Sequence, residues 1–329
     1  MRILLVMAAI LNFEITIGNY VFRRVSDVKI ETSWKTLGDT AAIILPNLKA
    51  LLDEKSAGGG IKGGDQVTIK LGYNDQLFTE FEGFVHRVEP NVPLKILCED
   101  YLYILKRQNL SMSWPSVSLR EVLQFIIKDT PITLSGRVPD VKLTKFRLNQ
   151  VNGATALDKI KKELGLFAFL RGKVLYVGFG YLEPESLNGN SVLFEYGKNL
   201  VETDLTYREA KDTLLRVKAV SILKDNKKLT VEFGDTGGEQ RTLYFYNISD
   251  KATLEKRARE ELNRIKRDGY EGKITAFGLP YVTHGDVVNY ADPAYPERAG
   301  RYVVDELAIS SGQNGYRREI TLGLKLNDS

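Results

Sequence analysis

The feature that most constrains this chain is a helix followed by an antiparallel meander, in residues 249–326. The helix is indicated by apolar residues at positions i, i+4, i+8 and i+11 among charged ones: Leu254, Ala258, Leu262 and Ile265. Ser249 or Asp250 can cap its start, and Gly269 follows its last turn. The apolar period then changes to two, which predicts strands near residues 273–277, 285–290, 300–304 and 318–322.

The same meander occurs once before. Three stretches match in order: 64–70 with 285–291, 83–88 with 300–305, and 95–99 with 318–322. The positions that carry the match are Gly64, Asp65 and Gly83 in the first copy, and Gly285, Asp286, Gly300 and Tyr302 in the second. Chance is the competing explanation, because short strands that begin with Gly-Asp are common. The shared order favours a β-domain that occurs twice.

Between the two copies the sequence pattern changes to alternating helices and strands. Ser118 and Glu121 form a capping-box pattern before a helix, residues 156–164 have helical spacing, and residues 166–177 read as a tight hairpin. We therefore predict an α+β, mainly β protein with two homologous antiparallel β-barrels and an inserted α/β module. The expected first barrel spans residues 7–107, the module 108–190 and 236–272, and the second barrel 191–235 and 273–326.

Composition describes an ordinary globular protein of 329 residues, long enough for two or three domains. The net charge of +4, from 46 basic and 42 acidic residues, gives no reason to expect a nucleic-acid or membrane partner. The single cysteine, Cys98, lies in an apolar strand and is interpreted as an inert core residue.

The N-terminus imitates a short signal peptide, with Arg2 before the apolar run of residues 3–11. A strand pattern begins at once at Phe13, without a polar stretch for cleavage, and the run is too short to span a bilayer. We expect no export signal, with Met7 as the natural start.

No convergent chemical site is predicted. His86 and His284 are the only histidines, lack metal-ligand spacing and are expected at the surface. The glycines at 58, 60 and 63 satisfy G-x-G-x-x-G, but a strand follows them where a dinucleotide site needs a helix. Asp65 and Asp286 read as turn residues rather than acids. We expect no catalytic residue, cofactor or metal, although the many carboxylates leave a glycosidase-like pair open.

The ordered set resembles the phage tail hub family, which includes late control D proteins, baseplate hubs of contractile phages and the N-terminal part of VgrG spike proteins. The resemblance covers nearly the whole chain. It is carried by residues 150–157 and 163–169, and by residues 278–280, 285–288, 300–304 and 322–325.

This resemblance implies two tail-tube-like barrels per chain, a homotrimer whose six barrels form a ring, and no catalysis. One side of the ring would meet a hexameric tail tube. The other would meet a trimeric spike, which must be a separate chain because no needle follows here. The implied location is the virion baseplate, assembled in the bacterial host cytoplasm. The alternatives are a glycan-binding module of a tail tip and, less favoured, a cell-wall hydrolase.

Overall fold

The computed structural model describes residues 10–46, 51, 60–178, 192–212, 214–223, 227–246, 248–266 and 268–326. The proposed start at Met7 and the glycine at 58 lie outside these residues. Among the described residues, no helix is long and apolar enough to cross a membrane.

The first β half contains seven strands and a short helix. They are β1 (Leu11–Ile17), β2 (Tyr20–Phe22), β3 (Asp27–Ser33), β4 (Thr40–Leu45), β5 (Gln66–Tyr73), β6 (Gln76–Glu89), β7 (Leu94–Glu99) and α1 (Leu102–Leu105). The strands pair in the order β3-β4-β7-β6-β5-β1-β2, antiparallel throughout. Alternation decides which face enters the core: in β3, Val28 and Ile30 are buried, whereas Lys29 and Glu31 are exposed.

The second β half contains six strands. They are β13 (Val192–Glu195), β14 (Leu200–Arg208), β18 (Gly269–Phe277), β19 (Val287–Ala291), β20 (Gly300–Gly312) and β21 (Gly315–Leu326), with a 3-10 turn at Pro296–Arg298. They pair in the order β14-β18-β21-β20-β19-β13, antiparallel except that β13 runs parallel to β19.

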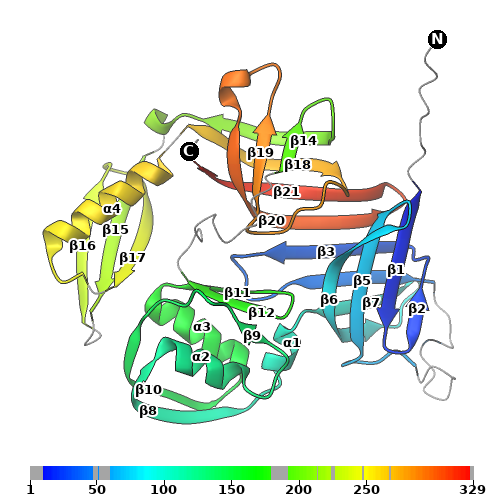
Figure 1. The fold of residues 1–329 in the computed structure, drawn as a ribbon, viewed down its shortest axis with the longest axis horizontal. Helices are drawn as coiled ribbons and strands as arrows, with labels where there is room; N and C mark the ends of the chain where they lie inside the picture. The colour runs from blue at the N-terminus through cyan, green and yellow to red at the C-terminus, as the bar shows by residue number, and fades with distance from the viewer. Residues whose placement is uncertain are drawn as a thin grey trace.

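The two β halves form one continuous sheet. β3 pairs with β20, so thirteen strands are connected, and one apolar cluster contains residues of both halves (Figure 1). The prediction of a mainly β protein with large antiparallel sheets is confirmed. The expected separate barrels are not found: among the described strands neither half closes, because β14 and β2 end the main path of the sheet. β3, at the margin of the first half, hydrogen-bonds to β20 of the second half.

The α/β module lies between the halves in the sequence. It contains β8 (Leu110–Ser118), α2 (Leu119–Ile127), β9 (Thr133–Leu134), β10 (Lys142–Val151), α3 (Gly153–Leu164), β11 (Phe167–Arg171) and β12 (Val174–Gly178). The predicted capping box of Ser118 and Glu121 is present at α2. Asn152 caps α3, and Gly165 ends it in the left-handed conformation. The buried faces of both helices meet in a second apolar core.

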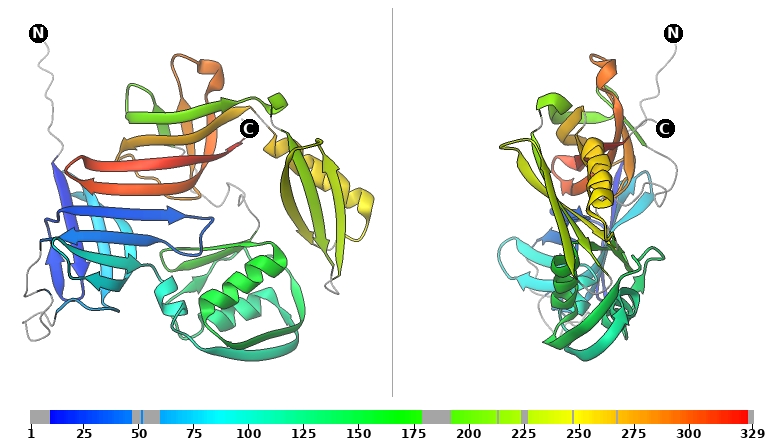
Figure 2. Two further views of the ribbon diagram at one scale, coloured as in Figure 1. Left: turned by 180° about the vertical axis from the view of Figure 1, so that it is seen from behind. Right: turned by 90° about the vertical axis from the view of Figure 1, so that its left-hand side faces the viewer.

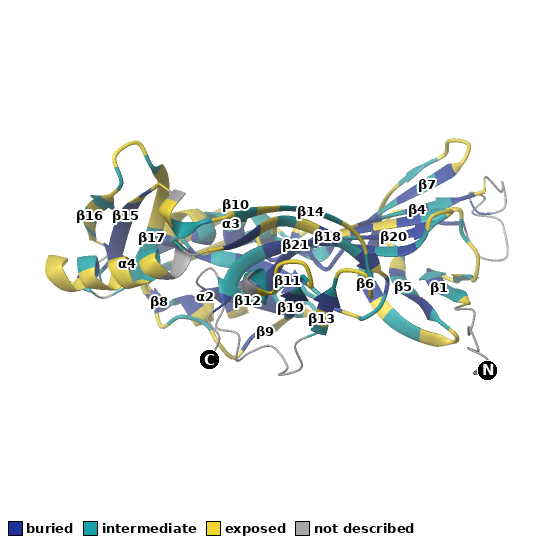
Figure 3. Cartoon of the chain, turned by 90° about the horizontal axis from the view of Figure 1, so that it is seen from above, coloured by how far each residue is buried: buried dark blue, intermediate teal, exposed yellow. Residues whose placement is uncertain are grey.

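A separate small unit interrupts the second β half. β15 (Leu215–Ile222), β16 (Lys228–Gly234) and β17 (Glu239–Tyr246) form their own sheet, which α4 (Lys251–Ile265) covers. A 3-10 turn, Ala210–Asp212, precedes them. Figures 1 and 2 show this unit set to one side of the β halves, and Figure 3 shows buried β15 beneath the largely exposed outer face of α4.

This unit corrects two predictions. Residues 215–234 were assigned to the second barrel, but β15 pairs only with β16 and β17 in the described chain. The α4 helix, capped by Asp250 as predicted, was expected to pack on the α/β module. Its Leu254 and Ala258 instead pack on Val217 and Ala219 of β15.

Candidate functional site at the joint between the two β halves

The first copy of the Gly-Asp motif is a tight turn into β5. Gly64 has φ +95°, a conformation that favours glycine. Its N–H donates to the Val85 carbonyl at 2.9 Å, and the Val85 N–H donates to the Asp65 carbonyl at 2.8 Å. The Asp65 carboxylate accepts from the Lys62 N–H at 2.9 Å and so closes the turn.

The second copy repeats this geometry bond for bond. Gly285 has φ +81°, and its N–H donates to the Val304 carbonyl at 2.7 Å. The Val304 N–H donates to the Asp286 carbonyl at 2.8 Å, and the Asp286 carboxylate accepts from the Thr283 N–H at 2.9 Å. Each aspartate carboxylate therefore stabilises the turn in which it lies. Val85 and Val304 occupy equivalent positions.

A β-bulge extends the equivalence. The register shifts between Val85 and Arg87 where β6 meets β7, and between Val304 and Glu306 where β20 meets β21. The bulged residues, His86 and Asp305, are therefore counterparts.

The register also corrects the predicted match of Gly83 with Gly300. Gly83 faces Val67 of β5, and the equivalent position facing Val288 of β19 is Tyr302. A Cβ on Gly83 would lie 2.2 Å from the Glu99 carbonyl oxygen, so this position needs glycine. Tyr302 instead fills the core, and its hydroxyl accepts from the Tyr270 N–H at 3.0 Å. Gly300 only begins β20.

The strand pairs that follow are equivalent too. β7 pairs with β4 and β4 with β3, as β21 pairs with β18 and β18 with β14. Aligning the registers puts β14 in the place of β3. The two hairpins differ in their connections: residues 34–39 join β3 to β4, whereas residues 209–268 carry the small unit between β14 and β18.

The joint between the halves is built on β3 and the bulge of β20. Six residues of β3, from Ser33 to Val28, pair with residues 306–311 of β20. Beyond the strand, the Trp34 Nε1–H donates to the Asp305 carboxylate at 3.0 Å, and the Lys35 ammonium lies 2.8 Å from its other oxygen. Burial raises the pKa of Asp305, and Lys35 and Trp34 oppose that shift.

A pair of buried carboxyl groups fixes the loop that leaves β3. The Asp39 carboxylate accepts from the Ser33 N–H at 3.2 Å, and the Asp100 carboxylate accepts from the N–H groups of Asp39 and Leu102, each at 2.9 Å. Burial raises the pKa of Asp39 well above its usual range, and the neighbouring Asp100 adds to the shift. Burial likewise raises the pKa of Asp100, to about 7.

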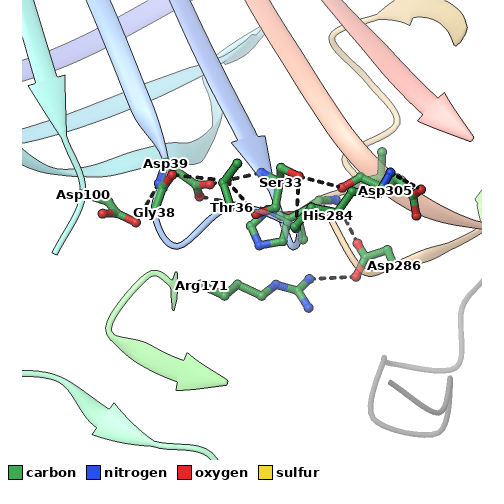
Figure 4. A network of polar contacts seen from close by, with 12 residues as sticks. Ser33, Thr36, Gly38, Asp39, Asp100, Arg171, His284, Asp286 and Asp305 are labelled. Atoms are coloured by element: carbon green, nitrogen blue, oxygen red, sulfur yellow. Dashed lines mark hydrogen bonds and ion pairs between the residues drawn. The ribbon is translucent and has the colours of Figure 1, made fainter. Parts of the chain in front are cut away.

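The α/β module reaches the joint through β11, and Figure 4 shows the Arg171 side chain directed at Asp286. The Arg171 guanidinium lies 2.7 Å from the Asp286 carboxylate, in the turn that precedes β19. The Leu170 N–H donates to the Leu37 carbonyl at 3.2 Å, and the Phe167 ring meets Trp34 at 4.7 Å between centroids. Three parts of the chain therefore meet at this joint.

The two histidines differ in burial. His86 has a 51% exposed side chain, in line with its predicted surface position. His284 does not: its side chain is 1% exposed and packs edge-on against Phe169. Burial, with the nearby Arg171, lowers the pKa of His284 to about 3, so its ring is neutral at pH 7. Residue type alone does not indicate this burial, because the apolar cover comes from β11, more than a hundred residues away.

A buried ion pair provides a second connection between the halves. Arg318 of β21 is fully buried, and its guanidinium donates to the Glu80 carboxylate of β6 at 2.6 Å. It also donates to the carbonyls of Gly278 and Val282, at 3.2 and 2.8 Å. The Tyr316 hydroxyl donates to the same carboxylate. Sequence reasoning missed this pair, although the alternation of β21 places Arg318 on the same face as Tyr316 and Ile320 and was the signal that could have found it.

The described residues contain no group of three or more His, Cys, Asp or Glu side chains that could hold a metal ion. Cys98 is buried, and burial raises the pKa of its thiol to about 12, in keeping with the predicted inert role. In the joint, the carboxylates of Asp39, Asp100, Asp286 and Asp305 and the guanidinium of Arg171 bind backbone N–H groups, neighbouring side chains or each other. Their arrangement can hold three parts of the chain in one orientation.

Comparisons with known proteins identify the fold. No family model matches the sequence, and no curated protein matches it. Among solved structures, the chain is similar to a tail protein from Neisseria meningitidis, with TM-score 0.62, 14% identity and 97% of each chain covered. It is also similar to the 43 kDa tail protein of prophage MuSo2 from Shewanella oneidensis, with TM-score 0.59, 14% identity, and 95% of this chain and 98% of that chain covered.

A third similar structure is a component of the type VI secretion system of E. coli, with TM-score 0.57, 9% identity, and 95% of this chain and 75% of that chain covered. At these identities the likeness concerns the fold. The chain therefore has the fold shared by phage tail proteins and this secretion-system component, as the resemblance in its sequence led us to expect.

Proposed function

We propose that this protein is a structural hub of a phage tail or a phage-like injection machine, without catalysis of its own. It would act as a homotrimer that connects a hexameric tail tube to a trimeric spike formed by another chain. The proposal is supported by the similarity of the fold, which covers nearly the whole of two tail proteins, one of them from a prophage.

The observation that carries the proposal is the repeat. Each chain holds two β halves that share the order of five strands, the same Gly-Asp turn and the same bulge, joined side by side rather than face to face. A side-by-side contact uses different surfaces on its two members, so repeating it generates a ring when the rotation closes. Three chains then supply six similar units, the number that a hexameric tube presents, and three copies of everything else, the number that a trimeric spike presents.

Mass measurement tests this proposal. Purified full-length protein should elute as a particle three times the mass of the 37.1 kDa chain, and its images should show a ring with six similar lobes. Mixing with the tail tube protein of the same phage should give a complex that contains both. A stable monomer that binds no tube protein would overturn the hub, and release of peptidoglycan fragments by that monomer would favour the hydrolase instead.

A further inference from the structure

One edge of β14 is open to a second strand. Within the described chain β14 pairs only with β18, whereas its counterpart β3 lies between β4 and β20. The inward positions of β3, Val28, Ile30 and Thr32, are buried. The equivalent positions of β14, which register alignment identifies as Thr203, Leu205 and Tyr207, are only half-buried. β14 therefore has the pattern of a strand whose second neighbour is missing.

A complementary free edge exists on β6. Residues 87–89 pair with β7 on one side, and no described strand pairs with the other side. Their counterparts in β20 are residues 306–308, which β3 covers. Residues 86–89 can be compared with residues 305–308, and three of these four positions are more buried in β20, where β3 covers the strand. His86 is exposed and Asp305 is buried, Arg87 is exposed and Glu306 is half-buried, and Val88 is half-buried and Leu307 is buried.

We propose that β14 of one copy pairs with residues 87–89 of β6 in the next copy, as β3 pairs with β20 within the chain. This inference rests on the proposed function, because it names the contact by which the ring closes. The register follows from the internal joint: Arg208 faces Arg87, Tyr207 faces Val88, and Thr206 faces Glu89. Three residue pairs form, because Pro90 ends β6 where β20 continues.

The charges at this edge are compatible with the pairing. Arg87 lies 2.5 Å from Glu89 and Arg208 lies 2.8 Å from Glu271, so each of the two facing arginines is paired with a carboxylate of its own chain. In the proposed register Glu89 also lies diagonally across from Arg208, within reach of a long side chain.

Specificity comes from a second contact, here called the corner, between the residue that follows β3 or β14 and the bulged residue of β20 or β6. In the internal joint, Trp34 donates a hydrogen bond to Asp305. Glu209 takes the place of Trp34, and His86 takes the place of Asp305. Donor and acceptor have exchanged sides: the imidazole of one copy donates to the Glu209 carboxylate of the next. Glu209 forms an ion pair with Lys211 in the single chain, and His86 Nδ1 lies 4.0 Å from a Glu99 carboxylate oxygen.

Disulfide trapping in the full-length protein tests the register. Thr206→Cys with Glu89→Cys puts two thiols at facing positions, within the Cα separation that a disulfide accepts. The matched control, Glu202→Cys with Glu89→Cys, moves one thiol four residues along the exposed face of β14, roughly 13 Å away. The natural Cys98 is buried and gives little background.

Under mild oxidation the first pair should give covalent dimers and trimers on a non-reducing gel, with no larger products, and the control at least about tenfold less. A trimer by mass that gives equal cross-linking in both pairs, or none, overturns this inference and leaves the hub proposal standing. A protein that is monomeric by mass overturns both.

A charge exchange tests the corner independently of cysteine chemistry. His86→Glu places a carboxylate opposite Glu209 and should raise the dissociation constant of the trimer at least about tenfold. Adding Glu209→Lys to His86→Glu should restore the trimer, since the pair is then attractive. Because a merely damaged His86 surface would not respond to a change at Glu209, failure of that rescue overturns the proposed corner contact.

Discussion

Breaking the ion pair between Glu80 and Arg318 should strongly destabilise the joined β halves. The two side chains are essentially buried, with exposures of 1% and 0%. Glu80→Ala removes the carboxylate that binds Arg318 in the described chain and leaves a buried guanidinium with two carbonyl partners and the Tyr316 hydroxyl. Removing one partner of a buried pair costs about 3–5 kcal/mol. For a unit of this size each kcal/mol corresponds to a fall of about 2–4 °C in melting temperature.

The measurement is hydrogen exchange of peptides from β6 and β21, at fixed protein concentration, since a chain with several cores need not unfold in one step. Two control variants are needed to interpret the loss of stability in Glu80→Ala. Glu319→Ala breaks the neighbouring exposed pair with Lys273 and should cost less than about 1 kcal/mol. The double change Glu80→Leu with Arg318→Met removes both charges and should be far milder than Glu80→Ala alone. A Glu80→Ala loss as small as that of Glu319→Ala would refute the assignment of this pair as a structural connection.

Three further predictions concern single elements. Leu254→Ala should cost about 2–5 kcal/mol in local unfolding of the small unit, whereas Glu260→Ala on the exposed face of α4 should cost less than about 0.5 kcal/mol; equal losses would contradict the packing of α4 on β15. The pKa of Asp100 is raised on folding, so its contribution to stability is present below about pH 4 and is lost as pH rises towards 7; Asp100→Asn should flatten the stability curve across that window, and a parallel curve would contradict the shift. Cys98 in the folded protein should resist iodoacetamide at pH 8, and rapid labelling by mass spectrometry would contradict its burial.

The sequence predicts the local elements well and the connections between them poorly. The caps at Ser118, Asn152 and Asp250 depend on neighbouring residues alone, and so does the Gly-Asp turn. The match of Gly83 with Gly300 failed because the strands differ in length: Gly83 lies in the middle of β6, whereas Gly300 begins β20, and residue type does not show where a strand begins.

The assignment of β15 failed for a similar reason. Period-two alternation shows that a segment is a strand but not which sheet it joins. The joint itself could not be predicted either, because the pairing of β3 with β20 connects residues about 275 positions apart through backbone groups that every strand has.

The hairpins β3–β4 and β14–β18 are equivalent but have different connections, and the α/β module contacts the connection of each. In the first hairpin, the Leu170 N–H donates to the Leu37 carbonyl in the loop between β3 and β4. In the second hairpin, the connection between β14 and β18 contains the small unit. The Tyr246 hydroxyl of this unit donates to the Leu164 carbonyl at the end of α3. One module is thus attached to the element that follows β3 and to the element that follows β14. If β14 joins the next copy as proposed, the module fixes the angle between the joint inside the chain and the joint between chains. That angle decides whether repeated side-by-side contacts close after three chains or continue as a helix. On that proposal, the module would set the number of copies in the ring, although it lies outside the repeated strands.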